Sequence, residues 1–199
     1  MNYLRFNIQL ISIIIVSLIQ VSWVLPILNA MEQNEMVIFD FKNSDKNENW
    51  IIVNDSVMGG LSKSEFFISD SNTAIFRGTV SLENNGGFTS TRTRPRLFKL
   101  DEFKGILIRL KGDGKKYQFR IGTNDRSDGV AYRYQFTTEI SQWMTIKVPF
   151  NECVPVFRGR ILNNVAPISP KMIHQIGFLI ADNQAGQFQL EIEWIKAYK

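Results

Sequence analysis

Arginines and aromatic side chains are the residues of this 199-residue chain best suited to bind a ligand. A sugar or a peptide bound on a β-sheet needs flat stacking surfaces beside fork-shaped donors. The candidates on expected strands and loops are Arg92, Tyr117, Arg120, Tyr132, Arg133, Tyr134 and Trp143. Aromatic residues at every second position also pack in cores, so both interpretations stay open.

Two more arginines flank a glycine in Phe157-Arg158-Gly159-Arg160. Guanidinium groups in this spacing can clamp a carboxylate or a phosphate. Alternatively, Arg158 and Arg160 pin their long loop to acids such as Asp55 or Asp182, and we favour this structural role. Asp182 is also a binding candidate.

The stretch from Asn54 to Gly60, NDSVMGG, is either a ligand loop or a turn. Its candidates for binding are Asn54, Asp55 and, just beyond it, Ser62. As a turn, Asn54 and Asp55 would bond their own backbone, Met58 would fill an apolar gap, and Gly59-Gly60 would allow conformations closed to other residues. These physical arguments favour the structural role.

Enzymatic and metal chemistry finds little support in the sequence. The one histidine, His174, adjoins an apolar segment, and the one cysteine, Cys153, cannot form an internal disulfide. Zinc-ligand clusters and a phosphate-binding loop are missing, and residues 124–129 fit a polar loop better than a calcium site. Paired carboxylates would suffice for glycoside hydrolysis, but none stands out among Asp55, Glu65, Asp101, Asp125, Asp128 and Asp182. We expect a non-catalytic protein without cofactor or metal.

The elements that must position these residues are strands. Small or apolar residues alternate with others over 73–82, 130–136, 143–148 and 188–194, the period of strands with one buried face. Gly112-Asp113-Gly114 predicts a hairpin between 106–111 and 116–121, and Asn84 to Gly87 predicts a similar turn. Residues 151–170 form the longest irregular segment and the place for one short helix. About ten short strands without long helices predict an all-β, two-sheet jelly-roll sandwich.

The domain boundaries follow from the N-terminal segment. Arg5 precedes an apolar stretch ending in Leu28-Asn29-Ala30, which predicts a signal peptide or an uncleaved membrane anchor over 1–30. A short linker, 31–35, then leads to a single domain, 36–199. The net charge of +4 is too weak to indicate nucleic-acid binding. We expect an exported or membrane-anchored, extracytoplasmic protein rather than a mitochondrial one, with membrane contact only through an uncleaved leader.

The order of motifs resembles the complex I intermediate-associated protein 30 family over nearly the whole chain after the leader. The motifs are Trp50, residues 54–62 with Met58, Gly59 and Gly60, Phe76-Arg77-Gly78, residues 83–88 with Gly86, Gly87 and Phe88, Arg92, Gly112-Asp113-Gly114 with Tyr117, Trp143, Pro149-Phe150, residues 157–160, Ile176-Gly177-Phe178 and residues 182–188. The resemblance implies a galactose-binding-like jelly roll without catalytic residues. It also implies a chaperone role in assembling NADH:ubiquinone oxidoreductase, which the leader would argue against.

Two functions therefore stay open. The first is a non-catalytic interaction or assembly-factor domain that binds a protein partner through loops such as 54–62 and 157–160. The alternative is an extracytoplasmic carbohydrate-binding module that uses Tyr132, Tyr134 and Arg120 on a concave sheet.

Overall fold

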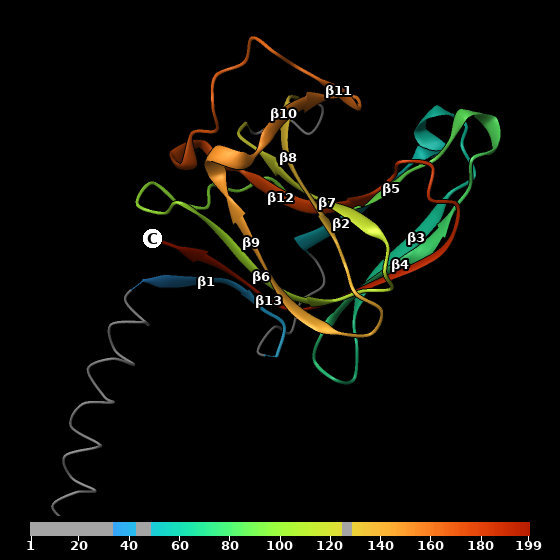
Figure 1. Ribbon diagram of the computed structural model, residues 1–199, viewed down its shortest axis with the longest axis horizontal. Helices are drawn as coiled ribbons and strands as arrows, with labels where there is room; N and C mark the ends of the chain where they lie inside the picture. Colours follow the sequence, from blue (N-terminus) through green and yellow to red (C-terminus); the bar gives the residue numbers. More distant parts are fainter. Residues whose placement is uncertain (1–33, 43–48, 125–128) are drawn as a thin grey trace, which may run out of the picture. The chain divides into compact units, whose positions relative to one another are not determined.

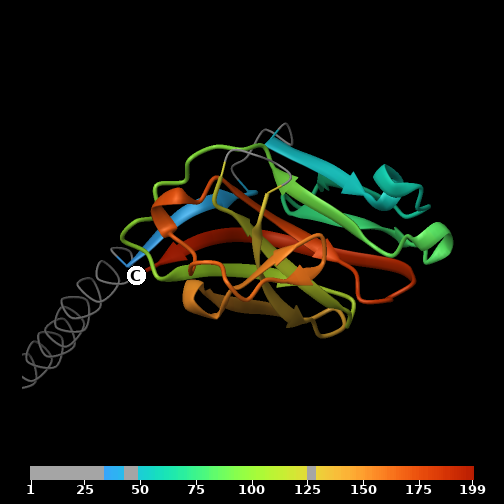
Figure 2. The same ribbon diagram turned by 90° about the horizontal axis from the view of Figure 1, so that it is seen from above.

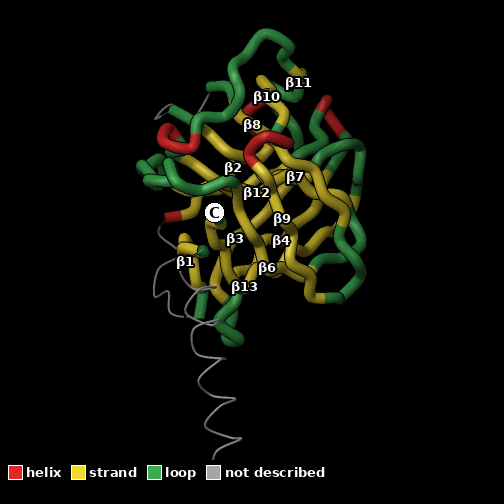
Figure 3. The backbone as a smooth tube through the Cα atoms, turned by 60° about the vertical axis from the view of Figure 1, so that its left-hand side comes forward, coloured by secondary structure: helices red, strands yellow, loops and turns green. Residues whose placement is uncertain are grey.

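Two antiparallel sheets form the described part of the protein, a computed structural model covering residues 34–42, 49–124 and 129–199 (Figure 1). These residues contain thirteen strands and short 3-10 helices, but no α-helix (Figure 3). The predicted all-β sandwich is confirmed. The predicted leader over 1–30 and most of the predicted linker over 31–35 lie outside the described residues, and β1 begins at Glu35. Apart from the first two residues of β1, the sandwich lies in one compact unit, Val37–Lys199.

Sheet A has the strand order β3-β4-β13-β6-β9, with β1 also paired to β13. Its strands are β1 (Glu35–Asp40), β3 (Lys63–Ile68), β4 (Ala74–Val80), β6 (Gly105–Lys111), β9 (Trp143–Pro149) and β13 (Gly186–Tyr198). The long β13 pairs with β4 over its first half and with β6 over its second, and Figure 2 shows it running beside β6.

Sheet B has the strand order β11-β10-β8-β7-β12-β5-β2. Its strands are β2 (Trp50–Asn54), β5 (Thr89–Thr93), β7 (Lys116–Gly122), β8 (Ala131–Thr137), β10 (Val154–Phe157), β11 (Arg160–Ile161) and β12 (Gln175–Ile180). The 3-10 helices are η2 (Asp55–Met58), η3 (Glu83–Asn85), η4 (Phe150–Glu152) and η5 (Pro170–Met172).

The core lies between the inner faces of the two sheets, where every second residue of a strand is buried. Trp50 of sheet B stacks on Phe66 of sheet A with 4.6 Å between ring centroids and also on Phe178 of β12. The Trp50 side chain is 8% exposed. Its ring therefore joins the sheets, and burial of such a ring stabilises the fold by about 2 to 3 kcal/mol.

The predicted hairpins at 112–114 and 84–87 are wrong, because each turn carries the chain from one sheet to the other. Gly112-Asp113-Gly114 follows β6 of sheet A and precedes β7 of sheet B. Residues 84–87 likewise lie between β4 of sheet A and β5 of sheet B. Glycine and asparagine signal a tight reversal in both cases, but only the strand pairing decides which sheet receives the next strand.

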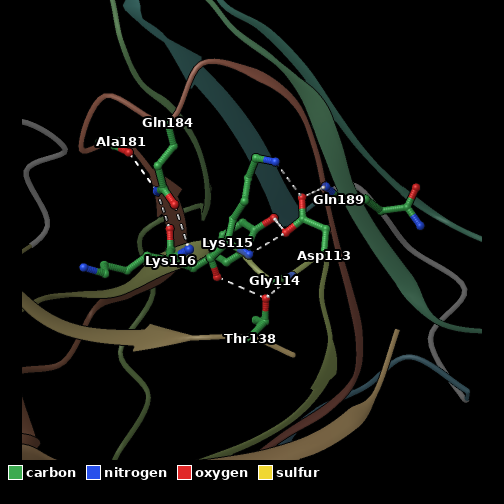
Figure 4. A network of polar contacts seen from close by, with 9 residues as sticks. Asp113, Gly114, Lys115, Lys116, Thr138, Ala181, Gln184 and Gln189 are labelled. Carbon is green, nitrogen blue, oxygen red and sulfur yellow. Dashed lines mark hydrogen bonds and ion pairs between the residues drawn. The ribbon is translucent and has the colours of Figure 1, made fainter. Parts of the chain in front are cut away.

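A polar network holds several of these inter-sheet connections together (Figure 4). The Asp113 carboxylate accepts hydrogen bonds from the Tyr117 hydroxyl at 2.9 Å and from the backbone N–H of Gln189 at 3.1 Å. The Thr138 hydroxyl accepts from the N–H of Gly114 and donates to the carbonyl of Lys115. The network thus ties the β6–β7 and β8–β9 connections to β13.

Residues 151–170, where one short helix was expected, contain a short hairpin, and the 3-10 helices η4 and η5 overlap the two ends of the segment. Strands β10 and β11 pair antiparallel, with Phe157 opposite Arg160. Arg158 and Gly159 form the two-residue turn with φ values of 46° and 80°. Two positive φ values match the twist of paired strands, which explains why a glycine stands here.

Candidate functional site

A groove of about 700 Å³ lies over the outer face of sheet B, away from sheet A. Its floor comes from β5, β12, β7 and β8, and its rims come from η2 at one edge and the β10–β11 hairpin at the other. Figure 1 shows β10 and β11 at the top of the view and β5 and β2 farther along the same sheet. Among the described residues, the lining of this groove gathers four arginines, two glutamines and one aspartate.

Three arginines form a row across the floor, which we call the arginine row: Arg92, Arg120 and Arg133. Arg120 of β7 pairs directly with Arg133 of β8. Gly177 of β12 pairs with Arg92 on one side and with Arg120 on the other. Because directly opposed residues point to the same face of a sheet, all three guanidinium stems rise from the groove floor.

Gly177 places no side chain between Arg92 and Arg120. A Cβ atom at this position would lie 2.3 Å from the carbonyl oxygen of Thr91 and 2.7 Å from Cβ of Arg92. A side chain is therefore excluded at this position. Gly177 is itself buried, although it lines the groove.

The positive charge of Arg120 is disfavoured by its burial and by the two neighbouring arginines of the row. Burial, with Arg133 and Arg92 adding repulsion, lowers the pKa of the Arg120 guanidinium to about 10. The Arg120 Nη1 donates to Oε1 of Gln118 at 3.1 Å, a neutral partner that does not balance its charge. None of the ion pairs within the described ranges involves Arg120 or Arg133. The groove therefore favours a negatively charged ligand.

Apolar side chains stand exposed on both rims. Val57 and Met58 of η2 are 71% and 64% exposed, and Phe157 at the end of β10 is 38% exposed. All three line the groove. The expectation that Met58 fills an apolar gap is wrong, because η2 turns its side chain outward at the rim. Exposed apolar groups beside a groove are typical of a binding surface.

The Arg158-Gly159-Arg160 motif reaches the groove through one of its arginines. Arg158 and Gly159 line the rim, whereas Arg160 lies outside the lining. The Arg158 guanidinium lies over the Phe157 ring at 5.3 Å. Asp55 cannot be the predicted pin for this loop, because its carboxylate already accepts hydrogen bonds from Ser62, Gly87 and Phe88.

Asp55 is the centre of a buried knot that joins two family-like motifs. Its Oδ1 accepts the N–H of Ser62 at 3.0 Å, and its Oδ2 accepts the Ser62 hydroxyl at 2.5 Å. The same Oδ2 accepts the N–H of Gly87 at 2.7 Å and of Phe88 at 3.2 Å. Asp55 is 0% exposed, so Asp55 and Ser62 hold the fold together and do not face a ligand.

The knot explains the glycines around it. A Cβ on Gly60 would lie 2.4 Å from Cγ of Asp55, and one on Gly86 would lie 2.6 Å from its Oδ2. At position 59 glycine is required by the backbone conformation, because Gly59 ends η2 with φ 89° and no atom lies near its missing Cβ. Gly87 also has a positive φ, 129°. The two glycine pairs thus combine close approach with turn conformation.

Burial alone would raise the pKa of Asp55, but the hydrogen bonds from Ser62, Gly87 and Phe88 outweigh it. Together they hold the pKa of this carboxyl below its ordinary value. Asp55 is therefore ionised at neutral pH, as an acceptor of several N–H and O–H donors should be.

The predicted aromatic platform faces the wrong side of sheet B. Tyr117 is 0% and Tyr132 is 5% exposed, and their hydroxyls donate to Asp113 Oδ1 and to the carbonyl of Ala166. Tyr134 lies opposite Phe119, two residues from Tyr132, and so shares this inner face. Period two places Tyr117 and Tyr132 in the core, leaves Tyr134 half-buried on the same face, and places their neighbours Arg120 and Arg133 in the groove.

Of the two remaining candidates, Asn54 has a structural role and Asp182 lines the groove. Asn54 accepts the Ser64 hydroxyl at 2.7 Å through Oδ1 and links β2 to β3. Asp182 lines the groove and accepts from Nε2 of Gln135 at 2.6 Å. The sequence did not single out Val57 or Gly177 as site residues. Gly177 is recognised as a site residue only from its pairing with Arg92 and Arg120. For Val57 the one sequence signal is its place in the 54–62 loop.

Comparison with known proteins places the domain. The family model for complex I intermediate-associated protein 30 matches residues 39–192. The chain belongs to this family.

Among the members of this family, the mitochondrial complex I intermediate-associated protein 30 of Mus musculus is 24% identical over 193 residues, which cover 87% of this chain and 59% of the mouse protein. An uncharacterized protein of Schizosaccharomyces pombe is 31% identical over 182 residues, with 81% of this chain and 83% of that protein covered. The chain therefore spans less than two thirds of the mouse relative.

Solved structures show the same fold. A family 11 carbohydrate-binding module from Clostridium thermocellum, in complex with a β-1,3-1,4-mixed-linked tetrasaccharide, matches with a TM-score of 0.63 and 20% identity. The match covers 83% of this chain and 95% of that module. At this identity the likeness establishes the sandwich alone.

The expected extracytoplasmic location is contradicted by these relatives. The family members from Mus musculus, Drosophila melanogaster and Neurospora crassa are all named as mitochondrial proteins. The expectation was drawn from the apolar N-terminal stretch, and hydrophobicity alone does not determine the compartment of a protein. Among the described residues, no helix has the length and apolar character needed to cross a membrane.

Proposed function

We propose that this chain is a non-catalytic assembly factor that holds a segment of a partner protein in the sheet B groove while mitochondrial complex I is built. Membership of the complex I intermediate-associated protein 30 family supports the assembly role. The relatives named for this role, such as those of Mus musculus and Drosophila melanogaster, are mitochondrial, which supports the compartment.

The observation that carries the proposal is the groove with its exposed apolar rims. Val57 and Phe157 lie on opposite edges of sheet B and both line the groove. A partner segment crossing the floor would cover both side chains and remove apolar surface from water. Each buried side chain of this size contributes about 1.5 to 3 kcal/mol to binding before the ordering costs are subtracted.

The groove offers little for catalysis. Asp182 is the single carboxylate among the described residues that line it, and it is hydrogen-bonded to Gln135. Acid and base catalysis of glycoside hydrolysis needs two carboxyl groups. The arginine row binds charge and does not transfer protons, since a guanidinium stays protonated.

Carbohydrate binding is the weaker alternative. The likeness to a carbohydrate-binding module supports only the fold, and Tyr132 and Tyr134, the expected stacking platform, face the core. A glycan would have to bind on arginines and rim side chains instead. Calorimetry with the β-1,3-1,4-mixed-linked tetrasaccharide tests this alternative directly.

The proposal is tested by affinity purification of the tagged full chain from mitochondria of its own cells, followed by native gels and cross-linking mass spectrometry. We expect co-purification with a complex I assembly intermediate and cross-links to groove residues. Val57→Ser combined with Phe157→Ser should reduce this recovery severalfold. Ile140→Ser is the matched control, because Ile140 is 73% exposed and lies outside the groove lining. Wild-type protein that recovers no complex I subunit would overturn the proposal.

A further inference from the structure

We infer that the arginine row is a carboxylate-recognition site and that the groove takes an extended acidic segment of a partner protein, with acidic side chains at its centre and apolar side chains at both ends. This inference rests on the proposed function, because it names the chemistry of the segment that the groove holds.

The first step is the geometry of the row. Arg120 and Arg133 are direct neighbours across β7 and β8, while Gly177 separates Arg120 from Arg92. Arg92 and Arg133 are therefore three strand spacings apart, about 14 Å. One carboxylate cannot span this distance. Alternate side chains of an extended segment are about 7 Å apart on one face, so two acidic residues spaced by one can reach both halves of the row.

The second step is the position of Gly177, which places no side chain between Arg92 and Arg120 and whose backbone is buried. An acidic side chain that lies over this position can meet both guanidinium groups. The close approach of Thr91 and Arg92 to the missing Cβ keeps larger residues out of this position. Planar guanidinium groups bind carboxylates with two parallel hydrogen bonds, which gives direction as well as strength.

The third step is the charge balance. Arg120 is half-buried beside two other arginines, and the described residues of the groove lining supply one carboxylate, Asp182, with four arginines: Arg92, Arg120, Arg133 and Arg158. A ligand with two or more negative charges offsets this repulsion. The repulsion also discriminates against basic segments, which would add to the positive charge.

The fourth step is the pair of apolar rims. Val57 and Phe157 lie on opposite sides of the arginine row, one after β2 and the other at the end of β10, and the strand registers place these two ends at diagonally opposite corners of the floor. A segment that crosses the floor along this diagonal meets apolar, basic and then apolar surface in order. This order fits acidic residues flanked by apolar ones and does not fit a uniformly acidic tail.

The experiment uses the full chain and a fluorescein-labelled peptide with two glutamates spaced by one residue and leucines at both ends. We expect saturable binding that weakens between ~50 mM and ~500 mM NaCl. A peptide with glutamine in place of both glutamates should bind about ten-fold more weakly or worse. A phosphoserine version and inorganic phosphate distinguish carboxylate recognition from general anion binding, and tighter binding of the phosphoserine version would overturn the carboxylate assignment.

Arg120→Gln and Arg133→Gln should each weaken binding of the glutamate peptide about ten-fold. Arg160→Gln is the matched control, since it removes the same charge from the hairpin outside the groove lining and should change binding less than about two-fold. Equal binding of the glutamate and glutamine peptides would overturn the inference, as would an equal loss in Arg160→Gln.

If Arg120→Gln and Arg133→Gln still recover the complex I intermediate while Val57→Ser with Phe157→Ser does not, the inference fails and the proposed function stands. Recovery of no intermediate by wild-type protein fails the proposed function alone.

Discussion

Oδ2 of Asp55 accepts a hydrogen bond from the backbone N–H of Gly87 at 2.7 Å, although 32 residues separate them in the chain. Asp55 opens η2, which carries the chain from sheet B to sheet A, and Gly87 ends the connection that returns from sheet A to sheet B. One buried carboxylate therefore fastens two inter-sheet connections, and these are the helical turns that lie side by side near β5 in Figure 1.

Replacing Asp55 with asparagine should destabilise the domain. The amide NH₂ would face N–H and O–H groups that now donate to Oδ2, and these donors would lose their acceptor. We expect a loss of about 2 to 4 kcal/mol in the free energy of unfolding, measured by urea denaturation. Asp101→Asn, at an exposed position, is the control and should change little. An Asp55→Asn protein that unfolds at the wild-type urea midpoint would contradict the assigned role of the knot.

Stability should fall in acid through Asp55. The pKa of Asp55 is lowered in the folded protein, so the folded state binds this proton less tightly than the unfolded chain does. The stabilisation is present above the unfolded pKa, about 4, and is lost as the pH falls through the lowered folded pKa. Urea midpoints between pH ~3 and pH ~7 should show wild type and Asp55→Asn converging at the acid end. A constant difference over this range would argue against the mechanism.

Neighbouring glycines should respond differently to alanine. Gly60→Ala places a Cβ against the Asp55 carboxylate, 2.4 Å from Cγ, and should break the knot at a cost of about 3 kcal/mol or more. Gly59→Ala meets no neighbouring atom but must adopt φ 89°, which costs about 1 kcal/mol. Thermal unfolding of the two variants gives the comparison. Equal losses would show that turn conformation, and not contact with Asp55, requires both glycines.

Removal of the Arg120 charge should stabilise the free protein while it weakens ligand binding. Burial and the neighbouring arginines lower the pKa of Arg120, so its charged form is less favourable in the fold than in the unfolded chain. Arg120→Gln should gain about 1 kcal/mol, allowing for partial exposure and the lost hydrogen bond to Gln118. Melting curves without ligand measure this gain. Arg160→Gln should show none, and a clear destabilisation by Arg120→Gln would mean that Arg120 serves the fold.

Much of the sandwich could be predicted because its local rules are visible in the chain. Alternation over 130–136 identified β8, and it also determined that Tyr132 and Arg133 face opposite sides. What alternation could not supply was which of these sides is the core, since either face of a strand can be buried. The aromatic platform was therefore assigned to the ligand face. Met58, which lies in η2 outside the alternating strands, was assigned to the interior because an apolar side chain can fill a gap.

By itself, the sequence determined the strands and the turns at glycine and asparagine, because these depend on neighbouring residues. It also indicated the family, because the resemblance depends on which motifs occur and in what order. Tertiary structure alone decided that Gly112-Asp113-Gly114 changes sheets, that Asp55 binds Gly87, and that Arg92, Arg120 and Arg133 form one row. The physical reason is the same in each case: strand order and register bring distant residues together, and these are set by how the two apolar faces pack, which no local pattern records.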